Sequence, residues 1–176
     1  MPKETVKKTE GDGPAGAQVG RPQVPETYGL KASKEYLPWS FAEERLTASK
    51  NYWICSARPD GRPHSIPVWG FWLGGTMYFG TAVDSRKGKN LAHNPAVSVH
   101  LESGDEVVIL EGRAVVVDTQ DRTVTKGLDA ESRKKYKMPL VLTPDTVIYR
   151  VRPRVVLAWR EKDFPSSATR WEFAEA

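Results

Sequence analysis

Three cations follow one another closely at the start of a predicted helix: Arg86, Lys87 and Lys89. An apolar strand ends at Thr81, and after a short turn the helix is expected to begin at Ser85. The first N–H groups of a helix carry partial positive charge, so acids rather than cations are normally favoured there. Cations on a positive helix end suggest that an anion binds between them. A solvated basic helix face is the alternative.

The residue types around this helix start suit an oxyanion such as phosphate. Thr81 and Ser85 carry hydroxyl groups, and Ser85 can either cap the helix or donate a hydrogen bond to the anion. Arg86 and Lys87 offer charge-assisted hydrogen bonds. The nucleotide-binding patterns GxGxxG and GxxxxGK[ST] are both absent from the sequence. We therefore expect a phosphate site that is not built on either of those loops.

Other kinds of chemistry find little support. The three histidines, His64, His93 and His100, have no helical spacing, and no CxxC or HExxH motif is present, so no metal site is expected. There is no GxSxG motif, and Cys55 lies within an apolar strand, where a buried, inert thiol is expected. His64 follows a hairpin turn, and it is the histidine that we consider facing a pocket.

Length and composition indicate one ordinary domain behind a short tail. The chain has 176 residues, a net charge of +4 and a mean hydropathy of −0.51. Residues 1–28 hold four glycines and four prolines with little apolar periodicity, so we expect a flexible N-terminal tail, with the folded domain at residues 29–176. The basic residues are scattered, and no apolar run could span a bilayer. We expect a cytoplasmic protein with neither nucleic acid nor membrane as its partner.

The hydrophobic pattern predicts short strands joined by hairpins, with few helices between them. A capping box at Ser40 and Glu43 predicts a helix that ends near Lys50. The other helices are expected at residues 85–93 and 118–136, and the strands at residues 52–58, 64–72, 76–81, 96–101, 107–118, 147–152, 155–159 and 169–173. This order predicts a mainly β fold, a small antiparallel barrel with peripheral α-helices.

Aromatic residues are concentrated on the strand at residues 64–72. Alternation sends Trp69 and Phe71 to one face of that strand and Trp72 to the other. The six tryptophans exceed what one small core needs. Some could flank a planar cofactor, although the barrel core or a dimer interface is the default place for any single one.

Taken together, several of these segments resemble the pyridoxamine 5'-phosphate oxidase-like split-barrel superfamily. They are most similar to its actinobacterial branch of flavin- and deazaflavin-dependent oxidoreductases. The combination of RPDGRPH, a PVW strand, and SRK ahead of NP carries the resemblance, which extends over residues 37–173. The matching segments are residues 52–58, 59–64, 67–69, 81–87 and 90–95.

The resemblance implies a six-stranded antiparallel split β-barrel that forms a homodimer, with two cofactor sites at the subunit interface. It places the cofactor phosphate on Thr81, Arg86 and Lys87, with Ser85 beside them and Lys89 as a basic neighbour. It also implies that one strand runs along the ring system of the cofactor and offers backbone hydrogen bonds to it. The residues of that strand are Ile66, Pro67, Val68 and Trp69.

Two departures from the family pattern narrow the expected activity. The arginine and lysine that true pyridoxamine phosphate oxidases carry on the second strand are replaced by residues 65–68, Ser-Ile-Pro-Val. Their C-terminal arginine motif also has no clear counterpart, so vitamin B6 oxidation is not expected. The branch resemblance favours coenzyme F-420 over FMN, although both carry a phosphate that this motif could hold.

The expected function is an oxidoreductase that transfers a hydride between F-420 or FMN and a small organic acceptor. No catalytic acid–base cluster is visible in the sequence, which suits hydride transfer. Candidate substrate contacts are His64, Trp69 and, from the second subunit, Trp159 and Arg170. The alternatives are a carrier that binds flavin, deazaflavin or a tetrapyrrole without turnover, and a degenerate barrel that acts as a structural dimer.

Overall fold

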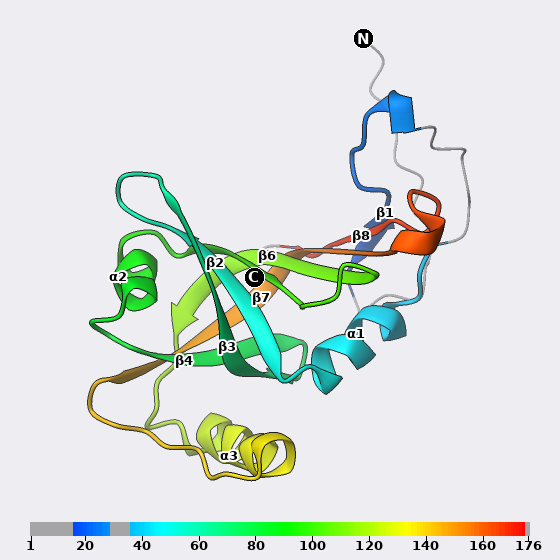
Figure 1. Cartoon of the computed structure of the whole chain (residues 1–176). Helices are drawn as coiled ribbons and strands as arrows, with labels where there is room; N and C mark the ends of the chain where they lie inside the picture. Colours follow the sequence, from blue (N-terminus) through cyan, green and yellow to red (C-terminus); the bar gives the residue numbers. More distant parts are fainter. Residues whose placement is uncertain (1–15, 29–35, 175–176) are drawn as a thin grey trace.

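The computed structural model describes residues 16–28 and 36–174 (Figure 1). Three α-helices form in this part of the chain: α1 (Trp39–Ala48), α2 (Arg86–His93) and α3 (Arg122–Tyr136). The strands are β1 (Gln18–Gly20), β2 (Asn51–Ala57), β3 (Pro63–Leu73), β4 (Thr76–Ala82), β5 (Ala96–His100), β6 (Glu106–Val116), β7 (Thr146–Arg160) and β8 (Thr169–Glu172). Two 3-10 turns are η1 (Glu26–Tyr28) and η2 (Glu161–Asp163).

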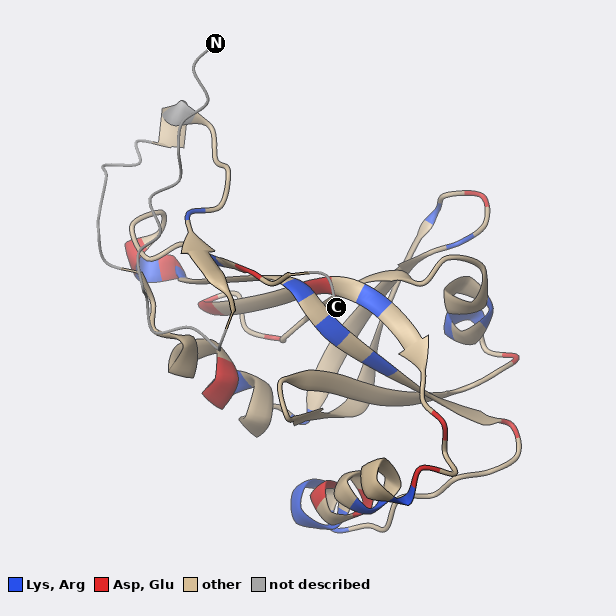
Figure 2. Cartoon of the chain, turned by 180° about the vertical axis from the view of Figure 1, so that it is seen from behind, with Lys and Arg blue, Asp and Glu red and all other residues tan. Residues whose placement is uncertain are grey.

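Six of these strands close into an antiparallel barrel. The sheet runs in the order β7, β4, β3, β2, β5, β6, and β6 then pairs with β7 to complete the circle. Figure 2 shows the barrel from behind, with β6 and β7 crossing the middle of the view. The barrel and its peripheral helices confirm the mainly β fold that the sequence pattern predicts and the six-stranded antiparallel barrel that the family resemblance implies.

Strand β7 is longer than predicted, because it runs unbroken through Pro153. Two strands around this proline, residues 147–152 and 155–159, were expected, but one strand covers both. Opposite Pro153 lies Gly112, and next to this pair the register shifts at a bulge, where β7 has one residue more than β6, Arg154. A bulge disrupts the ladder locally and therefore tolerates a residue that has no N–H to donate. The prediction of two strands was wrong for this reason.

Helix α1 begins differently from its predicted capping box. Pro38 is the N-cap residue and makes no side-chain capping bond, and Ser40 lies inside the helix. The helix ends at Ala48, two residues before the expected end. Proline fits a helix start because its fixed φ suits the entry and its missing N–H would have no partner there. The prediction of Ser40 as the cap was wrong.

The expected tail contains a short strand that the sequence did not predict. Residues 18–20 form β1, which pairs antiparallel with β8, and the side chain of Val19 is buried. Arg21 donates hydrogen bonds to the carbonyl oxygens of Ser166 and Ala168 at 2.6 and 2.7 Å. This strand is too short to show a hydrophobic pattern in the sequence. It forms because it pairs with the edge of β8. Residues 1–15 of the expected tail lie outside the described residues.

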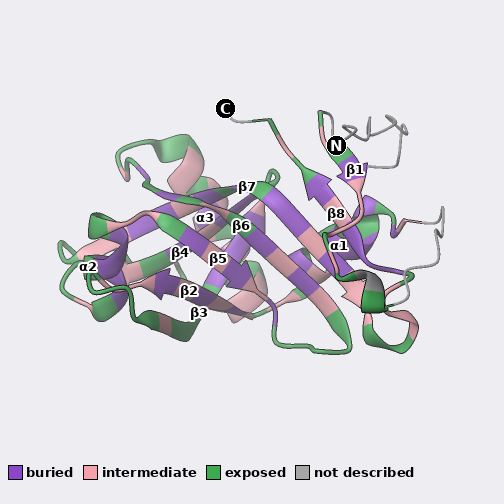
Figure 3. Ribbon diagram, turned by 90° about the horizontal axis from the view of Figure 1, so that it is seen from above, coloured by how far each residue is buried: buried purple, intermediate pink, exposed green. Residues whose placement is uncertain are grey.

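Strand alternation builds the core and leaves an outer face. On β2, Tyr52 and Ile54 are fully buried, whereas Trp53 and Cys55 point outward and are half-buried (Figure 3). The main buried cluster fills the barrel, and a smaller one joins Leu128 of α3 to the sheet. No helix in the described ranges is long and apolar enough to cross a membrane.

Candidate functional site

The turn from β4 into α2 holds two hydroxyl groups next to each other. Ser85 is the N-cap of α2, and its Oγ accepts a hydrogen bond from the Gly88 N–H at 3.0 Å, which confirms the predicted cap. The Thr81 Oγ1 and Ser85 Oγ atoms lie 2.8 Å apart. A Cβ on Gly88 would lie 2.5 Å from the carbonyl oxygen of Ala82, so only glycine lets the helix pack this closely on the turn. The two hydroxyl groups are therefore fixed beside the first N–H groups of α2.

Lys87 is a buried cation in the same turn. Its side chain is only 6 % exposed, and its Nζ lies 5.4 Å from the centroid of the Phe79 ring. Within residues 16–28 and 36–174, this side chain makes no ion pair and no hydrogen bond. Burial lowers the pKa of Lys87 to about 8, because the charged form loses water without gaining a counter-ion. A bound anion would supply what this ammonium group lacks.

Arg58 and His64 add positive charge and unpartnered nitrogens to the same region. The Nε of Arg58 and the Nδ1 of His64 are buried, and neither has a hydrogen-bond partner in the described part of the chain. Burial lowers the pKa of His64, and the positive charges of Arg58, Lys87 and Arg86 lower it further. Those repulsions place His64 among the cations near the start of α2.

Asn90 anchors α2 to the barrel from the buried face of the helix, which it shares with Lys87. It is fully buried, and its Nδ2 donates to the Ser56 Oγ on β2 at 3.1 Å. Its Oδ1 atom has no partner among the described residues. The sequence reasoning missed both Arg58 and Asn90. The available signal for Arg58 was its place as the last residue of the predicted strand at 52–58 and the first residue of the RPDGRPH motif.

Strand β3 leaves an open edge that leads away from this helix start. β2 pairs with β3 along residues 63–69, but β4 pairs with it only from Gly70 onward. Backbone groups that face away from β2 in residues 63–69 therefore meet no strand in the described structure. Ile66 and Trp69 lie on this stretch, 40 % and 57 % exposed. The edge offers free hydrogen-bonding groups and apolar surface to a planar molecule.

Helix α3 supports the far end of this edge through Tyr136. The ring of Trp69 stacks on Tyr136, with centroids 4.6 Å apart and planes at 10°. The Tyr136 hydroxyl accepts from the Gly70 N–H at 2.8 Å and is bonded to the carbonyl oxygen of Lys50 at 2.6 Å. Phe71 meets the same tyrosine edge-on, which confirms that it shares a face with Trp69.

The structure thus brings one group of predicted residues together and leaves another group apart. Thr81, Ser85, Arg86 and Lys87 meet at the helix start, with His64 nearby, while Lys89 is exposed on α2. Trp159 and Arg170 lie on β7 and β8, at the opposite end of the molecule from α2 (Figure 1). Within one chain these two residues are not part of the site; they were expected from a second subunit and stay a prediction.

A large hollow lies elsewhere, on the outer face of the barrel. It has a volume of about 1130 Å³, and none of the predicted site residues lines it. Cys55 does line it, with its Sγ 3.1 Å from the Ser65 Oγ. The expectation that this thiol is buried was wrong, because alternation along β2 turns Tyr52 and Ile54 inward and Cys55 outward. In the ranges that the structure covers, no group of three His, Cys, Asp or Glu residues could hold a metal ion.

Comparison with known families identifies the class of protein. The family model described as pyridoxamine 5'-phosphate oxidase matches residues 40–160. This chain belongs to that family, and the split barrel described above is the fold of its members. A comparison with curated proteins found no match.

Solved structures with the same barrel come from proteins of several kinds. One, described as an F420 reductase, has 25 % identity and a TM-score of 0.53, covering 65 % of this chain and 94 % of that one. A conserved hypothetical protein from Mycobacterium tuberculosis has 22 % identity and a TM-score of 0.62, covering 74 % and 88 % of the two chains. A heme binding protein from Mycobacterium smegmatis has 21 % identity and a TM-score of 0.55, covering 70 % and 55 %. The last two support the fold alone.

Proposed function

We propose that this protein is an oxidoreductase that transfers a hydride between a bound deazaflavin or flavin and a small organic acceptor. The observation that carries the proposal is Lys87, a buried cation without a counter-ion beside two hydroxyl groups and a helix N-terminus. Such a site fits the phosphate that both F-420 and FMN carry. Membership of the pyridoxamine 5'-phosphate oxidase family supports a cofactor of the flavin class.

The residues of this chain would divide the work of binding between two regions. Thr81, Ser85, Arg86 and Lys87 would hold the phosphate, with Arg58 and His64 contributing the nitrogens that lack partners. The open edge of β3, Ile66 to Trp69, would align the ring system and cover one side of it with apolar surface. When bound, the cofactor itself supplies the hydride chemistry. The protein orients the ring and excludes water.

F-420 is the preferred cofactor, and a homodimer is the preferred assembly. The F420 reductase with the same barrel is the solved structure with 25 % identity, and this favours F-420 over FMN. A second subunit would bring its own Trp159 and Arg170 toward the ring, since the distance along one chain is too great. The single-chain site at α2 is open on that side because the edge of β3 has no further strand in the described chain.

Titration of the protein with F-420 and, separately, with FMN tests this proposal. We expect binding in the micromolar range or tighter, and a loss of about 1.5–3 kcal/mol for each charge-assisted hydrogen bond removed in an Arg86→Ala/Lys87→Ala variant. A matched control is Arg122→Ala/Lys126→Ala, which removes two exposed cations from α3. The control should bind as the unmodified protein does.

Two results would contradict the proposal. Failure of both cofactors to bind below the high micromolar range would remove the enzyme hypothesis. Equal affinity in the Arg86→Ala/Lys87→Ala variant would return this helix start to an ordinary solvated basic surface. If F-420 binds but its reduced form passes no hydride to a panel of enones and quinones, a non-catalytic carrier is favoured instead.

A further inference from the structure

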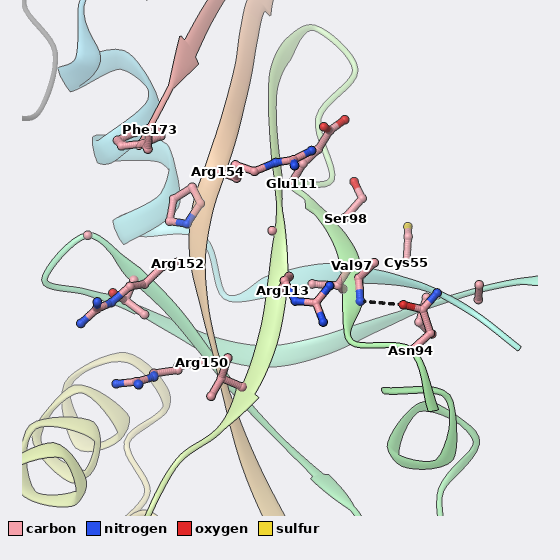
Figure 4. Close-up of a pocket in the computed structure, with 18 of the residues that line it drawn as sticks. Cys55, Asn94, Val97, Ser98, Glu111, Arg113, Arg150, Arg152, Arg154 and Phe173 are labelled. Atoms are coloured by element: carbon pink, nitrogen blue, oxygen red, sulfur yellow. Dashed lines mark hydrogen bonds between the residues drawn. The ribbon is translucent and has the colours of Figure 1, made fainter. Parts of the chain in front are cut away.

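Four arginines project from β6 and β7 into the hollow on the outer face of the barrel. Arg113 comes from β6, and Arg150, Arg152 and Arg154 follow at every second position of β7. They form a run of basic bands across the sheet in Figure 2, and Figure 4 shows their side chains around the hollow. Glu111 is the one acid among the residues lining it. The lining therefore carries a clear excess of positive charge.

The register of the two strands places two arginines opposite each other, and Figure 4 shows their side chains extending to opposite sides of the β6–β7 pair. Arg113 and Arg152 are Cα partners across the β6–β7 ladder. In the part of the chain that the structure describes, no carboxylate lies within ion-pair distance of Arg113, Arg150 or Arg152. A ligand with two anionic groups could therefore neutralise cations on both sides of this strand pair.

The shape and remaining surface of the hollow suit an organic molecule more than a bare ion. Its volume of about 1130 Å³ lies slightly above the range of about 300–1,000 Å³ that is typical of small-ligand sites. Val97, Val115 and Phe173 add apolar surface to the lining. Asn94 accepts from the Ala96 N–H at 3.1 Å through its Oδ1, which leaves its amide N–H₂ group as a donor.

We propose that this hollow is a second binding site, for a small organic polyanion that carries at least two carboxylate or phosphate groups. Arginine forks bind both kinds of oxyanion in a bidentate manner, so two such groups could be shared among Arg113, Arg150 and Arg152. The site shares no residue with the cofactor site proposed at Lys87, and it does not depend on that proposal. An acceptor substrate or a regulatory metabolite with this chemistry would both fit.

Isothermal titration of the full chain with citrate and, separately, with pyrophosphate tests the site. We expect at least one of the two to bind, with the stronger one identifying the ligand as a carboxylate or a phosphate compound. An Arg113→Gln/Arg152→Gln variant should bind about ten- to a hundredfold more weakly. Arg122→Gln/Arg133→Gln, which changes two arginines of α3 outside the hollow, should bind as the unmodified protein does.

The same titrations on a second variant distinguish binding in the hollow from binding at α2. The Arg86→Ala/Lys87→Ala variant removes the anion site proposed at α2, and citrate or pyrophosphate should still bind to it at the hollow. Complete loss of binding in this variant would locate the anion at α2 and overturn the proposal. Absence of binding by both probes would also overturn it, including the case in which a second copy of the chain covers the hollow. If the double glutamine variant does not fold, Arg152→Gln alone is measured, and unchanged affinity in that variant contradicts the site.

Discussion

At the scale of single residues, Lys87 connects burial, charge and ligand. Its pKa is about 8 in the folded protein against 10.5 for an ordinary lysine, so the unfolded chain binds more protons between these values. Stability therefore rises as the pH increases through this window, and below pH 8 the folded state carries the full cost of a desolvated charge. A buried lysine that lowers the stability of the free protein is consistent with a role for its charge in binding a ligand.

Replacing Lys87 with methionine should stabilise the free protein at pH 7. Methionine has similar length and no charge, and the drop in the Lys87 pKa from 10.5 to about 8 corresponds to about 3 kcal/mol. Denaturant unfolding at pH 7 and pH 10 measures the effect, and the gain should shrink at the higher pH. Lys135, which has a similarly lowered pKa, titrates in both proteins and cancels from the comparison. A variant that is less stable at pH 7 would show that Lys87 already has a partner.

The residue types of the site could be predicted from the sequence, but their surroundings could not. Thr81, Ser85, Arg86 and Lys87 are neighbours along the chain, so the anion hypothesis needed only a strand, a turn and a helix. Arg58 comes from the end of another strand and Asn90 from the buried face of α2, and what distinguishes both is a buried atom without a partner among the described residues. That property depends on tertiary packing, which the sequence does not display.

At the scale of elements, helix α2 is held in place by the absence of a side chain. Gly88 approaches the carbonyl oxygens of Ala82 and Val83 so closely that a Cβ would lie 2.5 and 2.8 Å from them. Backbone atoms cannot move aside as the end of a flexible side chain can. The helix start, its cap and the Thr81–Ser85 hydroxyl pair therefore depend on this glycine.

A Gly88→Ala variant should lose both stability and cofactor binding. In an ordinary helix the same change adds up to about 1 kcal/mol of stability, so a loss of about 1–3 kcal/mol would reverse the usual sign. Thermal unfolding and a cofactor titration measure the two effects. Gly104→Ala is the control, because a Cβ there meets nothing within 4 Å. An increase in stability in Gly88→Ala would show that α2 can shift without consequence.

The opposed arginines of β6 and β7 give a prediction at the same scale. Arg152→Gln removes one member of the Arg113–Arg152 pair and should stabilise the ligand-free protein by about 0.2–1 kcal/mol. The gain should be larger at low salt, because salt screens repulsion between exposed charges. Thermal unfolding at 20 mM and 500 mM sodium chloride makes the comparison. A destabilised variant at low salt would mean that Arg152 already has a compensating partner.

At the scale of the whole molecule, local patterns predicted most of the barrel. Turn signals and period-two alternation are local properties, and they located β2 to β6 within one or two residues at each end. The unbroken β7 was missed because Pro153 lies at a bulge of the β6–β7 ladder, and that bulge depends on pairing between distant segments. The pairing of β1 with β8 and the hollow between distant arginines depend on contacts between segments far apart in the sequence.

The fold distributes the charged residues unevenly over the surface and places positive charge in two separate regions. The sequence shows only a modest net charge of +4, with acids and bases mixed along the chain. Folding separates them, so that cations gather at the start of α2 and along β6 and β7 while many acids pair with exposed bases elsewhere. The net charge therefore says little about ligand binding. The positions of individual cations in the fold support the binding sites proposed here.

The pKa of Lys87 with and without cofactor tests the central claim most directly. It is measured by NMR on protein with isotope-labelled lysine side chains, with Lys87→Met identifying the resonance. The account predicts a pKa of about 8 in the free protein, rising to the ordinary value of 10.5 or above when F-420 or FMN places its phosphate beside the ammonium group. A cofactor that binds while this pKa stays at about 8 would contradict the account, because its phosphate would then lie elsewhere.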